Sequence, residues 1–522
     1  MTQTRKPAPK PEAQNPSFST SGMKLIVPLQ GVVQGRGGLL LGTLVPCALF
    51  YFLQLYLKRR RSSDATCATP PSEPALPRTS SRSNLSARAG SISRVRISRL
   101  ASQISRPDDS LYYVGLDRVS IDPFHALHNP HGVIQLGLSD NKLCFDLIGE
   151  WFARSLEGSV VSTSLSINGI APYQTFDGMM ELKMALSDFM HQVMGESVKF
   201  DPSNMVLTAG ATPAIEILSF CLADHGNAFL VPTPYYPGFD RDVRWRPGVD
   251  LIPVHCRSAD NFNLNITALE QAYSQARKRG VKVRGILISN PSNPVGNIMT
   301  QDMLYSLLDF AEEKNIHIIA DEVFAGSTYG SEKFVSIAEI LDSDYIDKSR
   351  VHIIYGLSKD LSLAGFRVGV IYSFNDSVLA AAKKLSRFSS ISAPTQRLVT
   401  SMLSDKRFIR EYFETNRKRI RQVHDEFVDC LSKLGIKCAK SSAGMFCWAD
   451  MSGLIRPYSE KGEIELWEKF LSVAKINITP GSSCHCIEPG WFRICFTTIT
   501  LEEIPLVIER IRRVVESCKS SS

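Results

Sequence analysis

The chain has 522 residues, which exceeds one ordinary domain, and 44% of them are apolar, enough to furnish a large core. Its net charge of +7 is uneven, because residues 1–106 contain 16 Lys and Arg against 3 Asp and Glu, which leaves residues 107–522 with a net charge of −6. No basic stripe interleaved with aromatic residues occurs in this acidic part, so nucleic acid is excluded as a predicted partner. The 12 cysteines lack both framework spacing and zinc-finger spacing, which predicts reduced thiols and no metal site.

The N-terminal part of the chain is predicted to consist of three segments. Residues 1–36 are expected to be a disordered tail. Residues 37–57 carry no charge and are long enough to span a bilayer, and the basic cluster 58–61 after them favours the cytosolic side for the rest of the chain. Residues 58–106 form a Ser/Arg-rich linker with too few apolar side chains to fold. We therefore expect a single-pass membrane protein with residues 107–522 facing the cytosol; a plastid or mitochondrial transit peptide, also rich in Arg and Ser, is the alternative.

From about residue 107 onward, short apolar runs alternate with amphipathic stretches. Runs that are apolar throughout predict strands buried on both faces, as in a mainly parallel sheet covered by helices, so the predicted fold class is α/β. Ligands bind beyond the carboxyl ends of such strands, and the residues directly after each run are therefore candidate site residues. The runs lie at 228–231, 285–288, 316–319 and 351–354.

Distinctive motifs stand directly after three of these runs. Residues 289–296 read SNPSNPVG, residues 321–324 read DEVF, and residues 356–359 read GLSK. An Asp at a strand end is often a helix N-cap and a Lys in a loop is usually solvated, so each motif alone is weak, but their order and spacing together are specific. Residues 207–213, LTAGATP, add small residues at the start of an apolar helix, where backbone N–H groups can approach a phosphate.

These motifs resemble those of the fold-type I pyridoxal 5'-phosphate (PLP) enzymes, and three further motifs resemble the plant 1-aminocyclopropane-1-carboxylate (ACC) synthase-like branch of the class I/II aminotransferase family. The further motifs are GLSDN at 137–141, PTPYYPGFDRD at 232–242, and the stretch 480–493, which runs from PGSS to EPGWFR. The resemblance extends from about residue 107 to the end of the chain. It implies PLP as the cofactor and a fold-type I transferase whose site lies at a homodimer interface.

The resemblance also implies two domains in the globular part. A large domain, 166–394, is expected to hold a mainly parallel sheet of the seven-stranded type together with the PLP site. A smaller α/β domain is expected to combine 107–165 with 395–522.

The resemblance implies a role for individual residues. Lys359 matches the Schiff-base lysine, which is the catalytic residue and needs a neutral amine to attack an aldehyde. Asp321 matches the carboxylate that keeps the ring nitrogen protonated, so that the ring can accept electrons. Arg493 matches the arginine that binds the substrate α-carboxylate through a two-pronged pair. The other matching cofactor positions are the ring contacts Asn293 and Tyr236 (or Tyr235, one residue earlier) and the phosphate contacts Ala211, Thr212, Ser358 and Arg367.

Four positions depart from the pattern of the resembling enzymes, one of them Gly356, where many relatives have a phosphate-binding Ser. Phe176 stands where ACC synthases have a Tyr that reaches across the dimer to the substrate, and Asp140 replaces a substrate-side Glu. Phe324 stands where the family usually has a Tyr that donates to the ring oxygen. None of these departures touches Lys359 or Asp321.

The leading hypothesis is an amino-acid aminotransferase that uses an aromatic amino acid or aspartate as donor and a 2-oxo acid as acceptor. Arg241, Arg244 and Arg246 could supply a second cation for a dicarboxylic donor, whereas Phe176 and Phe324 could form apolar walls for an aromatic one. One alternative is an ACC synthase, a lyase that acts on S-adenosylmethionine. Another is a non-enzymatic, membrane-tethered regulator that binds PLP.

Overall fold

The computed structural model describes residues 97–106, 110–157, 165–341 and 346–520. The chain divides into two compact units, Met1–Val95 and Arg96–Ser522, and the described residues all belong to the second. The expected disordered tail, the membrane segment and residues 58–96 of the expected linker lie outside the described residues, whereas the end of that linker forms helix α2 Arg99–Ile104.

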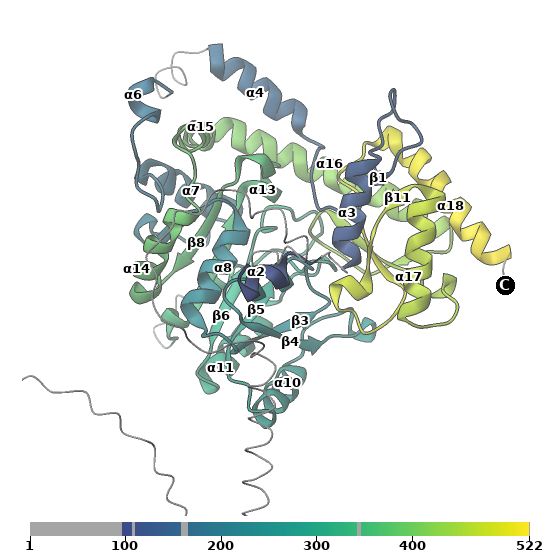
Figure 1. Ribbon diagram of the computed structural model, residues 1–522. Coiled ribbons are helices and arrows are strands. Elements are labelled where there is room, and N and C mark those ends of the chain that lie inside the picture. The colour runs from purple at the N-terminus through teal and green to yellow at the C-terminus, as the bar shows by residue number, and fades with distance from the viewer. Residues whose placement is uncertain (1–96, 107–109, 158–164, 342–345, 521–522) are drawn as a thin grey trace, which may run out of the picture. The chain divides into compact units, whose positions relative to one another are not determined.

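A seven-stranded sheet, here called the large sheet, forms the centre of the second unit (Figure 1). Its strand order is β2-β8-β7-β6-β5-β3-β4. The neighbours from β4 through β3, β5 and β6 to β7 pair in parallel, whereas β8 is antiparallel to both β7 and β2. The predicted mainly parallel α/β sheet is therefore confirmed. The strands are β2 Met205–Thr208, β3 Ala228–Thr233, β4 Asp250–His255, β5 Val283–Ser289, β6 His317–Asp321, β7 Val351–Gly356 and β8 Gly369–Ser373.

Helices lie on both faces of the large sheet, and the two faces contribute to different apolar cores (Figure 1). Ile286 and Ile288 of β5 pack in one core and Leu287 between them packs in the other, because successive side chains of a strand point to opposite faces. The first core includes side chains of α7 Met180–Val193, α10 Ile266–Lys278, α11 Gln301–Glu313, α12 Ile337–Ile340 and α15 Ala393–Ser404; the second includes α8 Ala211–Leu222, α9 Phe239–Arg244 and α14 Asp376–Leu385.

A third core joins an early segment of the described chain to its C-terminal part. Ile134 of β1 pairs in parallel register with Ile476 of β11, and both are buried in this core. Beside them lies a four-stranded antiparallel sheet in the order β12-β13-β10-β9. The residue boundaries expected for two domains stay a prediction. The elements of this part are α3 Leu111–Ile121, β1 Ile134–Gln135, α16 Lys406–Lys433, β9 Lys437–Cys438, β10 Phe446–Asp450, α17 Glu460–Lys469, β11 Ile476–Asn477, β12 Thr479–Pro480, β13 Trp491–Cys495 and α18 Ile504–Ser520.

Four further α-helices lie among the described residues. Helix α4 packs Ile148 and Trp151 into the first core, and α13 comes directly after β7. These helices are α2 Arg99–Ile104, α4 Phe145–Glu157, α6 Ile167–Ile170 and α13 Leu357–Asp360.

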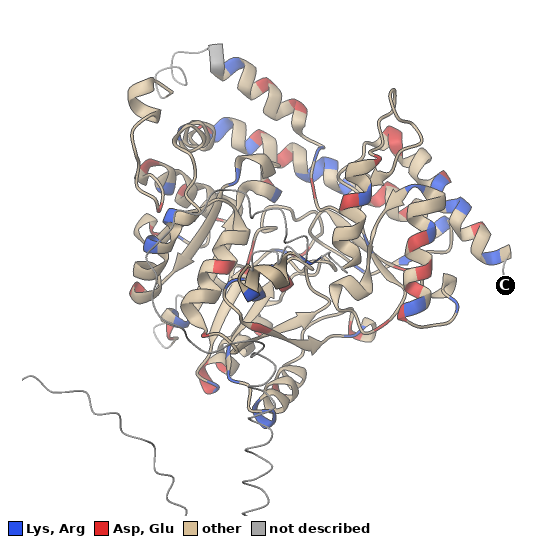
Figure 2. Cartoon of the chain, viewed as in Figure 1, with Lys and Arg blue, Asp and Glu red and all other residues tan. Residues whose placement is uncertain are grey.

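The predicted single-pass membrane localisation is corrected. A span needs about 20 consecutive apolar residues, and no helix in the described part of the chain is both long enough and apolar enough. Helix α16 has the length, with 28 residues, but it carries Lys, Arg, Asp and Glu along its whole course (Figure 2). The segment 37–57, on which the prediction depended, lies outside the described residues.

Candidate active site

A cavity of about 330 Å³ opens where the parallel strands of the large sheet end. Asp321 closes β6 and lies in register between Ser289 of β5 and Ile354 of β7, so residues that are distant in sequence meet at one edge. The volume lies in the range of small-molecule sites. Nine of the eleven predicted site residues line this cavity, namely Asp140, Ala211, Thr212, Tyr236, Asn293, Asp321, Ser358, Lys359 and Arg367.

Lys359 projects from α13, the short helix that begins directly after β7. Burial lowers the pKa of its amine to about 8, and the positive charge of Arg493 acts in the same direction, while the nearby groups of Cys495, Asp140 and Asp321 oppose it. The amine donates a hydrogen bond to the backbone carbonyl of Ser139. A lysine with this pKa is neutral in a substantial fraction of molecules near pH 8, as a nucleophile toward an aldehyde must be.

Asp321 is a buried carboxyl in the same cavity, with only 8% of its surface exposed. Burial raises its pKa to about 7, and the backbone N–H of Val323, the charge of Lys359 and a hydrogen bond from Ser289 partly offset this rise. No arginine or lysine forms an ion pair with it among the described residues. A carboxyl that is buried without a paired cation fits a protonated pyridine nitrogen as its missing partner.

The start of α8 forms the anion-binding end of the cavity. Gly210 is the N-cap of this helix and has φ +99°, a left-handed conformation that favours glycine. A Cβ at this position would collide with the guanidinium of Arg367, so glycine also lets that cation approach the helix terminus. Ala211 and Thr212 expose their N–H groups in the first turn, where a phosphate is stabilised by the helix dipole. With Ser358, these residues fit the phosphate of the predicted cofactor.

Arg493 lies behind the cavity wall and does not line the cavity itself. It is fully buried on β13 and donates hydrogen bonds to Oδ1 of Asn293 at 2.9 Å, to the carbonyl of Gly137 at 2.6 Å and to Oγ1 of Thr479 at 3.3 Å. Its Nε is buried without a hydrogen-bond partner. This spare donor fits the prediction that the guanidinium receives a carboxylate, which would complete its bonding.

Phe176 is the second predicted site residue, after Arg493, that does not line the cavity of its own chain. It is 43% exposed, and the guanidinium of Arg387 lies 5.7 Å from the centre of its ring.

The two tyrosines that were candidates for the contact with the cofactor ring differ in position. The ring of Tyr235 stacks on His485 at 4.4 Å and its hydroxyl donates to Asp240 at 3.0 Å, whereas Tyr236 lines the cavity.

Three residues of the site were missed by sequence reasoning. Tyr112 of α3 lines the cavity and meets the ring of Tyr236 edge to face at 6.1 Å. Asp242 also lines the cavity, from α9. Asp360 accepts hydrogen bonds from Gly326 N, Ser327 Oγ and Tyr355 Oη at 2.6 to 2.7 Å and thereby fixes the turn that carries Lys359. Two features of the sequence could have identified two of these residues: Asp360 is adjacent to Lys359, and Asp242 lies in the PTPYYPGFDRD motif.

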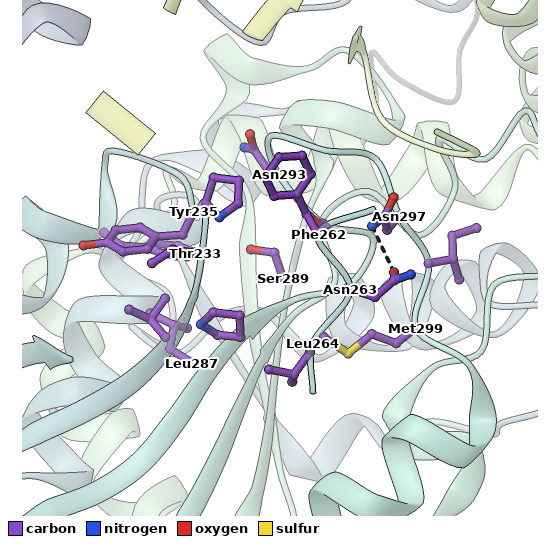
Figure 3. A pocket seen from close by; sticks show the side chains of 16 residues that line it. Thr233, Tyr235, Phe262, Asn263, Leu264, Leu287, Ser289, Asn293, Asn297 and Met299 are labelled. Carbon is purple, nitrogen blue, oxygen red and sulfur yellow. Dashed lines mark hydrogen bonds between the residues drawn. The ribbon is translucent and has the colours of Figure 1, made fainter. Parts of the chain in front are cut away.

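A second, much smaller cavity of about 50 Å³, drawn in Figure 3, shares the lining residues Asn293 and Phe239 with the first. Ser289 and Asn293 line it together with Leu287 and Tyr235, and a hydrogen bond of 3.0 Å between Asn297 and Asn263 closes one side (Figure 3). Its volume suits one or a few water molecules. The larger cavity is therefore the candidate site for a cofactor and a substrate.

Comparison with known proteins identifies the family that this chain matches. The family model for aminotransferase class I and II matches residues 133–511. A protein named probable aminotransferase ACS12 from Arabidopsis thaliana is 60% identical over 95% of this chain and 100% of its own length. An ACC synthase 6 from Oryza sativa subsp. japonica is 59% identical over 95% and 94% of the two chains, and an ACC synthase from Malus domestica is 46% identical over 80% and 90%.

Solved structures support the fold. An aromatic aminotransferase from Pyrococcus horikoshii matches with a TM-score of 0.62 and 22% identity, covering 78% of this chain and 99% of its own. An aspartate aminotransferase from Thermus thermophilus with maleate matches with a TM-score of 0.63 and 18% identity, covering 80% and 100%. At these identities the likeness concerns the fold alone.

Proposed function

The chain belongs to the class I and II aminotransferase family, whose members depend on PLP, and from this premise we propose that it is an amino-acid aminotransferase. The donor is an aromatic amino acid or aspartate, and the acceptor is a 2-oxo acid. The observation that carries the proposal is the cavity in which Lys359, with its lowered pKa, lies beside the buried carboxyl of Asp321 and in front of Arg493. Transfer of an amino group requires these three groups and a site that binds the cofactor.

Each of these residues has its own role in the proposed reaction. When bound, PLP supplies an aldehyde for amines and a ring that accepts electrons from the substrate Cα. Lys359 would hold the cofactor through its amine, and the same amine, once free, would accept the proton from the substrate Cα. Asp321 holds the proton on the ring nitrogen, and Arg493 orients the substrate through its carboxylate. The residues that hold and orient the cofactor are Ala211, Thr212, Tyr236, Asn293, Ser358 and Arg367.

The walls of the cavity favour an aromatic donor over aspartate. Arg241, Arg244 and Arg246 do not line the cavity. Arg244 and Arg246 instead pair with Asp250 and Glu216. A dicarboxylic donor therefore lacks the second cation that these arginines could have supplied. The aromatic side chains that line the cavity are Tyr112, Tyr236, Phe239 and Phe324.

We also infer a homodimer. Tyr173, Phe176 and Phe388 are exposed by 97%, 43% and 73%, and Arg387 lies over the rings of both phenylalanines. Exposed aromatic patches of this kind are typical of protein interfaces. Phe176 is the position that reaches the partner's site in the enzymes that this chain resembles, so a dimer would give this side chain a role that it lacks in one chain.

A second candidate function is ACC synthase, and the names of the rice and apple relatives favour it more than they favour the first. The residues of the chain favour transamination. Ring closure with loss of methylthioadenosine requires tight orientation of a large cationic substrate, and small misplacements are costly. Phe176 lacks a hydroxyl for this task, and the carboxylate of Asp140 reaches one methylene less far than a Glu. A non-enzymatic regulator is the weakest candidate, because it has no use for the reactive amine of Lys359.

One incubation experiment separates the candidates. The purified full-length chain, loaded with PLP, is given a panel of amino acids with 2-oxoglutarate and, separately, S-adenosylmethionine. We expect oxo-acid formation from an aromatic amino acid or aspartate and little ACC. Release of ACC without amino transfer across the whole panel would establish the lyase and overturn the proposal. A chain that does neither, although it binds PLP through Lys359, would overturn both.

A further inference from the structure

The active-site cavity contains a second carboxyl, on a half-buried side chain, that the proposed reaction does not use. Asp242 of α9 lines the cavity together with Asp321, Tyr236 and Lys359. Its Oδ2 atom is buried and has no hydrogen-bond partner. Leaving a carboxyl oxygen unpaired in a buried position costs free energy, so the cavity is organised for something that compensates this oxygen.

The charged and titratable groups around Asp242 come from several elements. Burial and then the charge of Asp321 raise its pKa to about 7, Glu216 acts in the same direction, and Arg241 opposes them. Burial also raises the pKa of Asp321 to about 7, and the N–H of Val323 and the charge of Lys359 partly offset that rise. Burial raises the pKa values of Tyr113 and Tyr236, and the charge of Asp242 adds to both shifts. The groups facing the pair are Glu216 of α8, Arg241 of α9, Tyr113 of α3, Tyr236 after β3, Ser289 of β5 and Lys359 of α13.

Two carboxyls therefore share one poorly solvated end of the cavity with too little positive charge. Arg241 does not compensate them fully, since the pKa of Asp242 stays high. A positive charge on the bound ligand would offset the repulsion between the two carboxylates, and it would allow both carboxyls to ionise. The protonated ring nitrogen of PLP is such a cation, and Asp321 is its proposed contact.

We propose that Asp242 is a positioning residue for the cofactor, supplying a second negative charge that keeps the ring nitrogen protonated while Asp321 makes the contact. The inference rests on the proposed role of Asp321 but not on whether the reaction is amino transfer or ACC formation. Asp242 acts through space, so its effect depends on its charge rather than on its shape. The pair sets the affinity for PLP and the pH range over which the ring can accept electrons.

The test compares two cofactors on the full-length chain. Dissociation constants are measured for PLP and for its analogue with carbon in place of the ring nitrogen, which cannot be protonated. We expect Asp242→Asn to weaken PLP about tenfold and the analogue less than about twofold, the effect of removing one charge several ångströms away at a moderate dielectric constant. Asp242→Glu should restore the affinity for PLP. The matched control is Asp240→Asn on the same helix, whose carboxyl is bound to Tyr235 and His485 and does not line the cavity.

A spectroscopic measurement tests the same inference without measuring enzyme activity. The ¹⁵N chemical shift of ring-labelled PLP, recorded on the loaded chain between pH 6 and pH 9, reports the protonated fraction of the ring nitrogen. We expect Asp242→Asn to lower the midpoint by about one pH unit and Asp240→Asn to leave it in place. Analogue binding shows that each variant is folded, and Asp242→Ser replaces Asp242→Asn if the latter does not fold.

The outcomes separate this inference from the assignment of Asp321. If Asp321→Asn abolishes ring protonation and Asp242→Asn changes neither the midpoint nor the ratio of the two affinities, Asp242 has no role at the ring and the inference is wrong. If Asp242→Asn weakens a cationic substrate instead, with PLP unaffected, the residue belongs to the substrate and the inference is equally wrong. If Asp321→Asn leaves ring protonation intact, it is the proposed role of Asp321 that fails.

Discussion

The lowered pKa of Lys359 leads to a pH-dependent prediction at the scale of one residue. Below pH 8 its amine is protonated and unreactive, and above pH 8 it is neutral, so the rate of covalent PLP capture should rise with pH through about 8 rather than through about 10. Stopped-flow absorbance of the PLP-free chain measures the rate, and Lys359→Ala should abolish capture. A midpoint near 10, or borohydride-fixed pyridoxyl on another lysine, would show that the amine is not activated as described.

The residues of the site differ in how well sequence could predict them. Lys359 and Asp321 stand directly after apolar runs, so the strand-end rule and the family motifs located them, and both line the cavity. Asp242 and Tyr112 project from helices, and the sequence does not show which side of a helix faces the cavity. Phe176 was expected, from the resemblance, to reach across a dimer to the neighbouring site, and on its own chain it is exposed and does not line the cavity. In the proposed homodimer its role would depend on a second chain, so the family motif suggests this role and the fold of one chain does not test it.

Asp360 supports a prediction about the turn between β7 and α13. Its carboxyl accepts three hydrogen bonds, from Gly326, Ser327 and Tyr355, and an Asn would place an amide donor against one of these donors. We expect Asp360→Asn to lower the free energy of unfolding by about 2 kcal/mol, measured by urea denaturation of the full-length chain. Asp309→Asn, on the exposed side of α11, is the control and should change little. Equal stabilities of the two variants would contradict a structural role for Asp360.

Gly210 supports a prediction about the start of α8. An alanine here adds a Cβ at φ +99° and collides with the guanidinium of Arg367, so the helix terminus and its arginine must separate. We expect Gly210→Ala to weaken PLP binding about tenfold or more, with a smaller effect on a cofactor analogue that lacks the phosphate. Gly149→Ala in α4 meets no atom within 4 Å and should bind PLP normally. Unchanged PLP affinity in Gly210→Ala would show that the phosphate lies elsewhere.

The strand boundaries show where sequence prediction of the elements ended. The apolar runs at 316–319 and 351–354 correspond to β6 and β7, but both strands continue further, to Asp321 and Gly356. The added residues are Ala320 and Asp321 in β6 and Tyr355 and Gly356 in β7, and of these Asp321 is a charged group that is buried for its chemistry rather than for its hydrophobicity. The antiparallel pairing of β8 with β7 and β2 also went unpredicted, since a run of apolar residues does not reveal strand direction.

The inferred homodimer is tested at the scale of the whole molecule. An aspartate in the exposed aromatic patch would be desolvated in an interface, so Phe388→Asp should raise the dimer dissociation constant at least about tenfold. Analytical ultracentrifugation measures this constant. Leu127→Asp, at a side chain that is 84% exposed in the loop after α3, is the control. A wild-type chain that is monomeric and fully active would refute the dimer.

Two truncations test which part of the chain the site requires. Every residue that lines the cavity belongs to the unit Arg96–Ser522, so removing residues 1–95 should leave PLP affinity, kcat and KM within about twofold of the full-length values. Removing residues 1–121 also deletes α3, and with it Tyr112, which is 4% exposed and packs against Tyr236 in the cavity wall. Burying such an aromatic contributes on the order of 2 kcal/mol, so the longer truncation should weaken substrate binding at least about tenfold, seen as a rise in KM. Fluorescence titration with PLP and initial rates on both truncated chains measure the difference. Equal KM values would mean that α3 plays no part in the site, and a loss of PLP binding already in the shorter truncation would mean that residues 1–95 support the catalytic unit.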